Sequence, residues 1–385
     1  MKKKVIVLGC AGSIGRSSLD VLANLSDDWE VVGLATGSRV DVLLEQAARF
    51  NSCAVAIADE ARAGAARRGA TGISRVFAGP AATVELLDAV ECDCVIAAIS
   101  GAASLHATLR AVELGRRVAL ANKEALVVAG GVLTALAQRT GAEIIPVDSE
   151  HSAVFQAVHA GRPEDVLRII LTASGGPFRT WSAERMQRIT PQDALEHPTW
   201  RMGPKITIDS ATMMNKALEV IEAHWLFNMP ADRIEVAVHP ESIVHSLVEF
   251  KDGSMMAQLG TPDMRTPIQY ALTYPARRAC PSKRLDLTAV GTLTFEAPDL
   301  DRFPALHLGF EAARRGGTAG AALNAANEAA VELFREGRIG FADIAGLTGR
   351  VMDAHAWEAS PALETLLAVD AWARDEVRKC TTSLR

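Results

Sequence analysis

The chain has 385 residues, 49% of them apolar and 22% charged, which predicts two or three globular domains and excludes general disorder. The 40 basic and 46 acidic side chains give a net charge of −6, which disfavours nucleic acid or an anionic membrane as a partner. No apolar run is long enough to span a membrane or to serve as a secretion signal. Six scattered cysteines show neither disulfide nor metal spacing. We therefore expect a cytoplasmic protein that acts on a small molecule.

The first 150 residues alternate short β-branched runs with helical patterns rich in alanine and leucine, as βα units around a parallel sheet do. Each run is brief and apolar, like a strand buried on both faces. Strands are expected at residues 5–8, 30–34, 54–58, 94–98, 117–120 and 143–146. The fold class is thus α/β with an N-terminal Rossmann-like parallel sheet.

A glycine-rich turn, GCAGSIGR at residues 9–16, follows the first expected strand and opens a helix near Ser13. Glycines let backbone amides and a helix N-terminus approach a pyrophosphate. The spacing is GxxGxxG rather than GxGxxG, and such turns also occur for packing alone. The βαβ context therefore carries the dinucleotide interpretation.

The second expected strand ends in Thr36, Gly37, Ser38 and Arg39, where an NAD site would have an acidic side chain. A hydroxyl and a guanidinium there favour the 2′-phosphate of NADP through charge-assisted hydrogen bonds. An ordinary loop arginine remains the alternative, because Asp41 lies nearby.

After residue 150 the pattern becomes that of an α+β domain followed by helices. A strand is expected at residues 167–171 and a long helix from about Ser210 to Phe227. Runs at residues 244–250 and 255–259 flank a KDGS turn and predict an antiparallel hairpin. Residues 275–304 hold several prolines and predict a surface linker, after which the pattern is helical to the end.

Two polar segments follow expected strands of the first domain. The sequence ANKE at residues 121–124 has the place of a ligand loop in an open α/β sheet. The sequence PVDSEH at residues 146–151 sets Asp148 and Glu150 two residues apart, on one side of an extended segment. Two such carboxylates repel each other unless a positive group lies between them.

A third polar segment runs from Lys205 to Glu219. A helix beginning near Ser210 would place Asn215 and Glu219 on one face with Lys216 beside them. With Asp148 and Glu150, Glu219 would complete an oxygen-only cage for Mg²⁺ or Mn²⁺. An exposed helical acid is an equally good interpretation of Glu219.

Phosphate donors and a lid are also expected. Ser174 in the turn SGGPFR would join Ser210, Asn215 and Lys216 around one phosphate. The loop HPTWRMG at residues 197–203 has the composition of a lid that excludes water. His239 and His245 have no metal spacing and are interpreted as structural residues.

Taken together, these motifs resemble the 1-deoxy-D-xylulose 5-phosphate reductoisomerase family. The resemblance covers residues 12–15, 121–124, 146–151, 174–179, 197–203, 209–219, 260–267 and 323–328, in the family's order. It implies a homodimer that depends on NADPH and a divalent metal. Its substrate is a sugar phosphate, 1-deoxy-D-xylulose 5-phosphate, which is isomerised and reduced to 2-C-methyl-D-erythritol 4-phosphate in non-mevalonate isoprenoid biosynthesis.

The resemblance also implies roles for single residues. The implied metal ligands are Asp148, Glu150 and Glu219. The implied catalytic residues are Lys123, Glu150 and His197, and the implied substrate contacts are Ser149, Glu150, Ser174, His197, Trp200, Ser210, Asn215, Lys216 and Glu219. The implied cofactor contacts are Ala11, Gly12, Ser13, Ile14, Gly37, Ser38, Arg39, Asn122, Glu124 and Gly203. Trp200 and Met202 would form the inner face of the lid, and either Glu150 or Lys123 would assist proton transfer.

On this basis we expect an NADPH-binding domain at residues 1–150 and a catalytic, metal-binding and dimerisation domain with a mobile lid at 151–285. A linker at 286–310 and a C-terminal helical domain at 311–385 would follow. The chain departs from the family in having Ala11 for a usual Thr, Arg39 for a frequent Asn and Glu241 for a common Gln. The Thr hydroxyl would be one phosphate contact, which Arg39 would replace electrostatically.

Two alternatives stay open at this point. Another NADP-dependent dehydrogenase, of the homoserine or semialdehyde type, would share the nucleotide domain but not the metal cage. The semialdehyde type would need a nucleophilic cysteine, and no motif here offers one. A non-catalytic NADP-binding sensor would have no reason to keep carboxylates, phosphate donors and a lid together.

Overall fold

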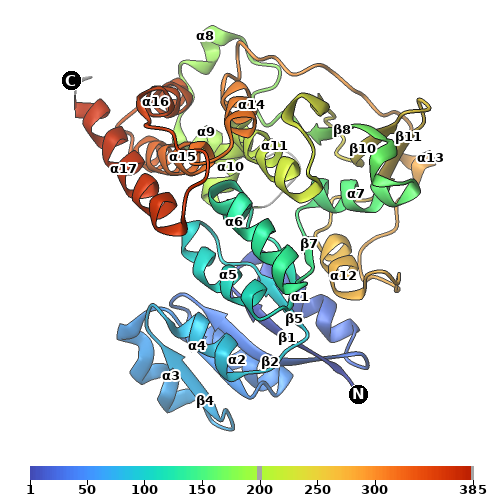
Figure 1. Ribbon diagram of the computed structural model, residues 1–385, viewed down its shortest axis with the longest axis vertical. Coiled ribbons are helices and arrows are strands. Elements are labelled where there is room, and N and C mark those ends of the chain that lie inside the picture. Colours follow the sequence, from blue (N-terminus) through green and yellow to red (C-terminus); the bar gives the residue numbers. More distant parts are fainter. Residues whose placement is uncertain (197–201, 383–385) are drawn as a thin grey trace. The chain divides into compact units, whose positions relative to one another are not determined.

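The computed structural model describes residues 1–196 and 202–382, and the chain forms two compact units (Figure 1). Unit 1 consists of residues 1–125, 133–152 and 263–283. Unit 2 consists of residues 126–132, 153–262 and 284–385. None of the helices in the described part of the chain is both long and apolar enough to cross a membrane.

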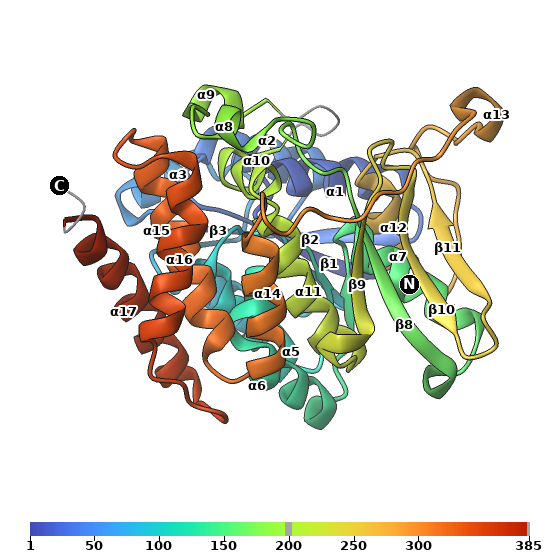
Figure 2. The ribbon, with the colours of Figure 1, turned by 90° about the horizontal axis from the view of Figure 1, so that it is seen from above.

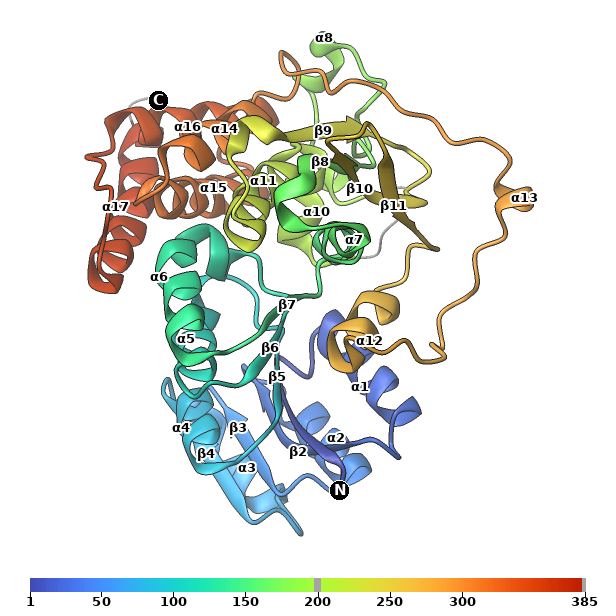
Figure 3. The ribbon, with the colours of Figure 1, turned by 45° about the vertical axis from the view of Figure 1, so that its right-hand side comes forward.

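Unit 1 is built on a seven-stranded parallel sheet in the order β4-β3-β2-β1-β5-β6-β7. Its strands are β1 (Lys3–Leu8), β2 (Trp29–Thr36), β3 (Ala54–Ile57), β4 (Arg75–Ala78), β5 (Cys94–Ala97), β6 (Arg117–Leu120) and β7 (Ile144–Pro146). Its helices are α1 (Ser13–Asn24), α2 (Val40–Phe50), α3 (Ala63–Gly69), α4 (Ala82–Ala89), α5 (Leu105–Glu113), most of α6 (Glu124–Thr140) and α12 (Arg265–Thr273). Figure 3 shows α4 and α5 against one face of the sheet and α1 and α12 against the other.

This architecture confirms the Rossmann-like sheet that the short apolar runs predicted. Strands such as β3 and β5 are buried along their whole length, as helices on both faces require. The strand order reverses between β1 and β5, so the loop after β1 lies at the topological switch point where open α/β sheets bind ligands. The sequence did not predict β4, because this edge strand is only half-buried and reads RVFA.

Unit 2 contains a four-stranded mixed sheet and a group of helices. The sheet has the order β11-β10-β8-β9, with β8 (Val166–Ala173), β9 (Ile234–Val238), β10 (Val244–Phe250) and β11 (Met255–Leu259). The helices are α7 (Ser149–Ala157), which begins in unit 1, and α8 (Ala183–Met186), α9 (Pro191–Ala194), α10 (Pro204–Ala211), α11 (Met214–Phe227), α13 (Leu287–Val290), α14 (Ala305–Arg315), α15 (Ala319–Arg335), α16 (Phe341–Ala354) and α17 (Leu363–Thr382). The expected hairpin at residues 244–259 is present, whereas β9 was not predicted.

Helix α11 lies between the sheet and the C-terminal helices of unit 2 (Figure 2). Leu218 and Ile221 of α11 share one hydrophobic core with Ile169 of β8 and Leu323 of α15. The helices approach closely where small residues meet, since a Cβ atom on Gly309 of α14 would lie 2.5 Å from the Cα atom of Ala217. A single packed core therefore fixes α11, the helix that carries Asn215, Lys216 and Glu219 of the third polar segment.

The expected long helix from Ser210 to Phe227 is wrong, because the segment forms two helices. Helix α10 ends at Ala211 and α11 begins at Met214. Met213 between them has φ +61°, in the left-handed region that a methionine seldom adopts. The hydroxyl of Thr212 stabilises the bend, since it donates to the carbonyl oxygen of Ile208 and accepts from the amide of Met214.

The expected linker at residues 275–304 is largely irregular, with the short helix α13 in its middle. An isolated bridge between Val238 and Glu296 attaches it to β9. His239 is fully buried, stacks on Phe295, and accepts hydrogen bonds from the amides of Ile243 and Val244 at Nε2. These contacts agree with the structural interpretation of His239.

The turn after β1 offers a test of this packing. A Cβ atom on Gly15 would lie 2.2 Å from the carbonyl oxygen of Gly9, whereas one on Gly12 would lie 3.4 Å from it. Alanine is favoured over glycine inside a helix by about 1 kcal/mol, but such a clash generally costs about 1–3 kcal/mol or more. We expect Gly15→Ala to lower the free energy of unfolding, measured by denaturant titration without cofactor. Gly12→Ala is the control, and equal stability of the two variants would contradict this account.

Candidate active site

The glycine-rich turn has the backbone that a phosphate-binding loop requires. Gly9 has φ +86°, and a Cβ atom on it would lie 2.3 Å from the carbonyl oxygen of Ala98, so only glycine fits. Gly12 is the N-cap of α1, and no side chain caps the helix. The first amides of α1 and the positive end of its dipole are thus available to an anion. Of the four predicted cofactor contacts here, Gly12 and Ser13 are exposed, Ile14 is half-buried and Ala11 is buried.

The end of β2 places the second predicted cofactor group in unit 1. Gly37, Ser38 and Arg39 are all exposed between β2 and α2, and Arg39 is the N-cap residue of α2. A cationic side chain in this position can reach an anionic group without losing a partner inside the fold. The exposure of Arg39 is compatible with the NADP interpretation.

The loop after β6 is held by a network around Asn122. The buried Asn122 amide donates to Glu124 Oε2 at 2.6 Å, and its Oδ1 atom accepts from Ser104 Oγ at 2.7 Å and from the amide of Ala125 at 2.9 Å. Because both the nitrogen and the oxygen of the Asn122 amide are hydrogen-bonded within unit 1, these bonds fix the orientation of its side chain. Hydrogen bonds thus hold the side chains of Asn122 and Glu124, two of the predicted cofactor contacts, in the loop after β6.

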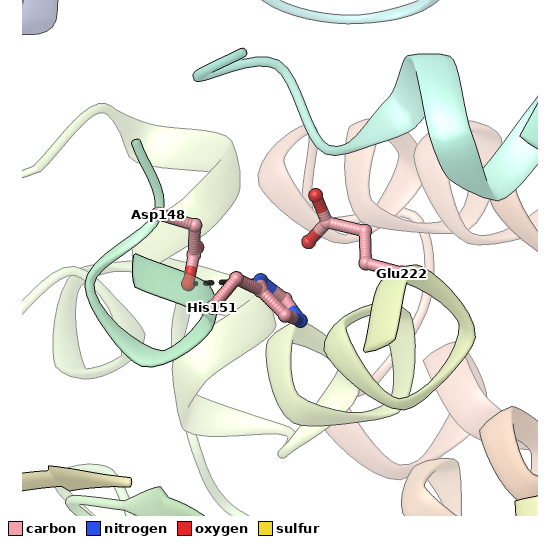
Figure 4. Close-up of side chains that lie close together, drawn as sticks. All are labelled: Asp148, His151 and Glu222. Atoms are coloured by element: carbon pink, nitrogen blue, oxygen red, sulfur yellow. Dashed lines mark ion pairs between the residues drawn. The ribbon is translucent and has the colours of Figure 1, made fainter. Parts of the chain in front are cut away.

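Asp148 is the centre of a charged group at the start of α7. Its Oδ2 atom lies 3.1 Å from Lys123 Nζ, and its Oδ1 atom lies 3.2 Å from His151 Nδ1 (Figure 4). The same Oδ1 accepts from the amide of Glu150 at 3.2 Å, and Ser149 Oγ donates to Glu150 Oε2 at 2.7 Å. Glu150 therefore stands in the first turn of α7 and Asp148 directly precedes that helix, which corrects the expectation of an extended segment. The positive charge that their proximity demands comes from Lys123.

The start of α11 holds the second charged group, which lies in unit 2. Glu219 is 0% exposed, its Oε1 atom accepts from Asn215 Nδ2 at 2.6 Å, and Lys216 Nζ forms an ion pair with Oε2. This arrangement confirms that the three side chains share one helix face. It also rejects the interpretation of Glu219 as an exposed helical acid. A buried carboxylate is stable here because an amide and an ammonium group replace its hydration.

Within unit 2, the turn that follows the predicted phosphate donor Ser174 lies against the backbone of Ser210. Gly175 and Gly176 after Ser174 both have positive φ, at +81° and +68°. A Cβ atom on Gly176 would lie 2.6 Å from the carbonyl oxygen of Ser210, so this turn lies directly against the end of α10. Gly203 caps the other end of α10, where its carbonyl oxygen accepts from Thr207.

Two predicted site residues, His197 and Trp200, lie outside the described residues, as does most of the expected lid. Within that loop the structure describes only Met202, which is half-buried, and Gly203. The departure at Glu241 has a local partner, since Glu241 Oε2 accepts from the amide of Thr294 at 3.1 Å.

The structure also shows charged and polar partners that sequence reasoning missed. His151 was overlooked because its three-residue spacing from Asp148 is meaningful only in a helix. Asp209 is 1% exposed and lies 2.6 Å from Lys205 Nζ, and it accepts from Asn327 Nδ2 at 2.9 Å. No sequence signal relates Asp209 to Asn327, which follows it by 118 residues.

Three of the six cysteines have thiols whose pKa is raised by burial. Burial raises the pKa of Cys10, in the glycine-rich turn, to about 12, and it raises that of Cys94 in β5 to about 12 as well. Burial also raises the pKa of Cys92. Buried thiols of this kind are poor nucleophiles, which disfavours these three as the nucleophile of a semialdehyde-type mechanism.

Comparison with known proteins identifies the family. Three family models match the chain. The model of 1-deoxy-D-xylulose 5-phosphate reductoisomerase matches residues 5–130, and the model of its C-terminal domain matches residues 144–227. The model of the DXP reductoisomerase C-terminal domain matches residues 259–376. The 1-deoxy-D-xylulose 5-phosphate reductoisomerase of Prosthecochloris aestuarii is 51% identical over 381 residues, covering 98% of this chain and 100% of its own.

Solved structures agree over the same length. The reductoisomerase of Zymomonas mobilis in complex with NADPH is 44% identical, with a TM-score of 0.93 and 99% of each chain covered. A DOX-P reductoisomerase in complex with NADPH, fosmidomycin and magnesium is 39% identical, with a TM-score of 0.94 and 99% of each chain covered. By its motifs, its fold and these matches, the chain belongs to the 1-deoxy-D-xylulose 5-phosphate reductoisomerase family.

Proposed function

We propose that this chain converts 1-deoxy-D-xylulose 5-phosphate to 2-C-methyl-D-erythritol 4-phosphate, using NADPH and a divalent metal ion, as its family does. The observation that carries the proposal is the buried group of Asn215, Lys216 and Glu219 at the start of α11. A fold could make this helix end apolar at less cost, so the charges there indicate a site for charged ligands. Family relatives of about half-identical sequence and NADPH-bound neighbours support the same activity over a dehydrogenase of another type or a sensor.

Asp148, Glu150 and Glu219 are the metal ligands in this proposal. The donor set fits Mg²⁺ or Mn²⁺, because it offers only carboxylate oxygens and includes neither a thiolate nor an imidazole as a ligand. Lys123 and His151 hold Asp148 from either side and so fix the direction of its oxygens. When bound, the ion would stabilise negative charge on the substrate's carbonyl and hydroxyl oxygens.

The substrate phosphate is assigned to the donors around the α10–α11 bend. Ser210 and the turn at Ser174 are neighbours, and Lys216 supplies a cation on the next helix. Ser149, Asn215 and His197 complete the substrate set that the family resemblance implies. Because Lys216 is buried, its charge is weakly screened and attracts a phosphate more strongly than a surface lysine would.

The reaction has proton movements in both of its steps, for which the chain must provide groups. Migration of a carbon–carbon bond requires that a substrate hydroxyl lose its proton while the former ketone oxygen gains one, and reduction of the resulting aldehyde requires a further proton on its oxygen as hydride reaches its carbon. Lys123 and Glu150 are the proposed groups, with His197 in the same catalytic set. Lys123 Nζ lies 3.1 Å from Asp148 Oδ2, so the ion pair holds the lysine beside the proposed metal ligands. Trp200 and Met202 of the proposed lid would exclude water from this chemistry.

NADPH is assigned to the switch point of the parallel sheet and supplies the hydride when bound. Its pyrophosphate would face the first amides of α1, and its 2′-phosphate would face Arg39. The proposed contacts are Ala11, Gly12, Ser13, Ile14, Gly37, Ser38, Arg39, Asn122, Glu124 and Gly203.

We also propose that the chain forms a homodimer through the outer edge of the mixed sheet. Strand β11 is an edge strand, and it exposes Met255, Met256 and Leu259. Exposed edges with apolar side chains are templates for pairing with another strand. Separately, we propose a cytoplasmic location for this protein. All six cysteines are free, as is usual in a reducing compartment.

The metal-ligand role of Glu219 predicts a selective loss. Glu219→Gln should lower kcat with Mg²⁺ or Mn²⁺ by at least about 100-fold, since it removes a charge on which metal binding depends. NADPH affinity, measured by fluorescence titration, should change little. Glu249→Gln is the control, because Glu249 is a carboxylate of the same unit that pairs with Arg168. Equal losses of turnover and of NADPH affinity in Glu219→Gln would refute the ligand role.

The cofactor assignment predicts a change of specificity at Arg39. Arg39→Asp should reduce the ratio of kcat/KM for NADPH to that for NADH by about tenfold or more, because an acid repels the 2′-phosphate. Arg49→Asp, in the last turn of the same helix, should leave the ratio unchanged. An unchanged ratio in Arg39→Asp would show that the end of β2 does not read the 2′-phosphate.

The dimer proposal predicts that charge on β11 disrupts association. Met255→Lys combined with Leu259→Lys should shift the sedimentation coefficient from that of a dimer to that of a monomer, because two ammonium groups would have to be desolvated at the interface. Leu300→Lys, at another exposed leucine, is the control and should stay dimeric. A monomeric wild type, or a dimeric double variant, would exclude this interface.

A further inference from the structure

Helix α10 is fastened to the C-terminal helices by one buried polar contact. Asn327 of α15 is 0% exposed and donates from Nδ2 to Asp209 Oδ1 at 2.9 Å, and Lys205 Nζ lies 2.6 Å from the other oxygen of Asp209. Around Asn327, α15 presents mainly alanines to its neighbours, and these are also buried. The contact is therefore a polar pair within an otherwise apolar helix interface.

Such a pair restricts how the helices can pack. Alanine and leucine surfaces tolerate small rotations and shifts, because dispersion contacts are weakly directional. A buried carboxylate does not, since any shift that breaks its hydrogen bonds leaves an uncompensated charge in the interior. Asp209 consequently fixes the rotation of α10 about its own axis relative to α15.

We propose that Asp209 and Asn327 are positioning residues for the substrate phosphate, a role that rests on the phosphate site proposed above. Ser210 follows Asp209 directly, so the rotation that the pair fixes also sets the direction of the Ser210 hydroxyl. The turn at Ser174 lies against the carbonyl oxygen of Ser210 and is set with it.

The bend after α10 carries the same constraint to α11. Thr212 bonds to Ile208 on one side and to the amide of Met214 on the other, and Met213 between the helices is held in the left-handed region. A bend tied on both sides transmits the orientation of α10 to the first turn of α11, where Asn215 and Lys216 stand.

The pair also gives the C-terminal helices a part in the site. Helix α15 is bound to α17 by Arg374, whose Nη2 atom lies 2.5 Å from Glu328 and whose Nε atom lies 2.7 Å from Asp370. The carboxylates of Glu328 and Asp370 keep Arg374 protonated and raise its pKa, although burial lowers it. Asn327 thus belongs to a helix that an ion pair holds against α17, and the contact with Asp209 connects α10 to this pair of helices.

The chain offers a matched pair of substitutions to test this role. Asn324 lies one turn before Asn327 on α15, is also 0% exposed, and donates to Glu328 instead of α10. Asn327→Leu and Asn324→Leu therefore each remove one buried amide from the same helix. We expect Asn327→Leu to raise KM for 1-deoxy-D-xylulose 5-phosphate by about tenfold or more, and Asn324→Leu to raise it less than about threefold, at similar loss of thermal stability.

Affinity for ligands separates positioning from general damage. Calorimetry with inorganic phosphate should show weaker binding to Asn327→Leu than to Asn324→Leu, while the dissociation constant of NADPH stays the same in both. Equal phosphate affinities in the two variants, or an equal loss of NADPH affinity in Asn327→Leu, would overturn the proposal. If the wild type does not turn over 1-deoxy-D-xylulose 5-phosphate, the proposed function fails, and the phosphate titration still decides the role of Asn327.

A reversed pair provides a rescue. Asn327→Asp alone opposes two buried carboxylates and should raise KM further than Asn327→Leu does. Adding Asp209→Asn restores one amide and one carboxylate at the contact, and it should return KM to within about threefold of the wild type. Additive defects in the double variant would show that the contact does not act as a pair.

Discussion

Burial of charge at the start of α11 is the constraint on which the packing of unit 2 depends. Glu219 is 0% exposed, and a carboxylate without water is tolerated only with partners that replace its hydration. Asn215 and Lys216 provide them from the same helix, at spacings of four and three residues. Removing one partner from a buried ion pair generally costs about 3–5 kcal/mol, so each member of the group is needed by the others. The residues proposed to bind ligands thus also hold one another in the free protein.

The same constraint explains features that would otherwise be unfavourable. Met213 adopts a left-handed conformation, which costs about 1–3 kcal/mol for a residue other than glycine or asparagine. Because of this bend, α10 and α11 run in different directions. Ser210 therefore lies at the end of one helix and Lys216 at the start of the next. In unit 1, Asp148 plays the corresponding part, because Lys123 and His151 fix it from two sides at the start of α7.

The sequence predicted what local patterns encode and missed what distant residues decide. Apolar runs located six strands of the parallel sheet, and helical spacing placed Asn215, Lys216 and Glu219 on one face. The bend at Met213 could not be predicted from the sequence, because the segment holds neither glycine nor proline where α10 ends. The helical start at Asp148 did carry a signal, an N-cap type followed by Glu150 in the first turn, but the preceding strand suggested extended structure instead. The contact between Asp209 and Asn327 joins residues 118 positions apart, and only the folded chain shows it.

The net charge of this protein gives no information about how charges are arranged at its proposed site. Each buried or half-buried ion pair contributes one positive and one negative group, so it adds nothing to the total of −6. Three such pairs lie in the proposed catalytic machinery or beside it, namely Lys123 with Asp148, Lys205 with Asp209 and Lys216 with Glu219. An acidic protein can therefore bind anionic ligands, because the field at a ligand depends more on the arrangement of the charged groups near it than on the net charge of the chain. Water and salt screen the charges on the surface, so the excess of acids there acts only weakly on groups in the interior.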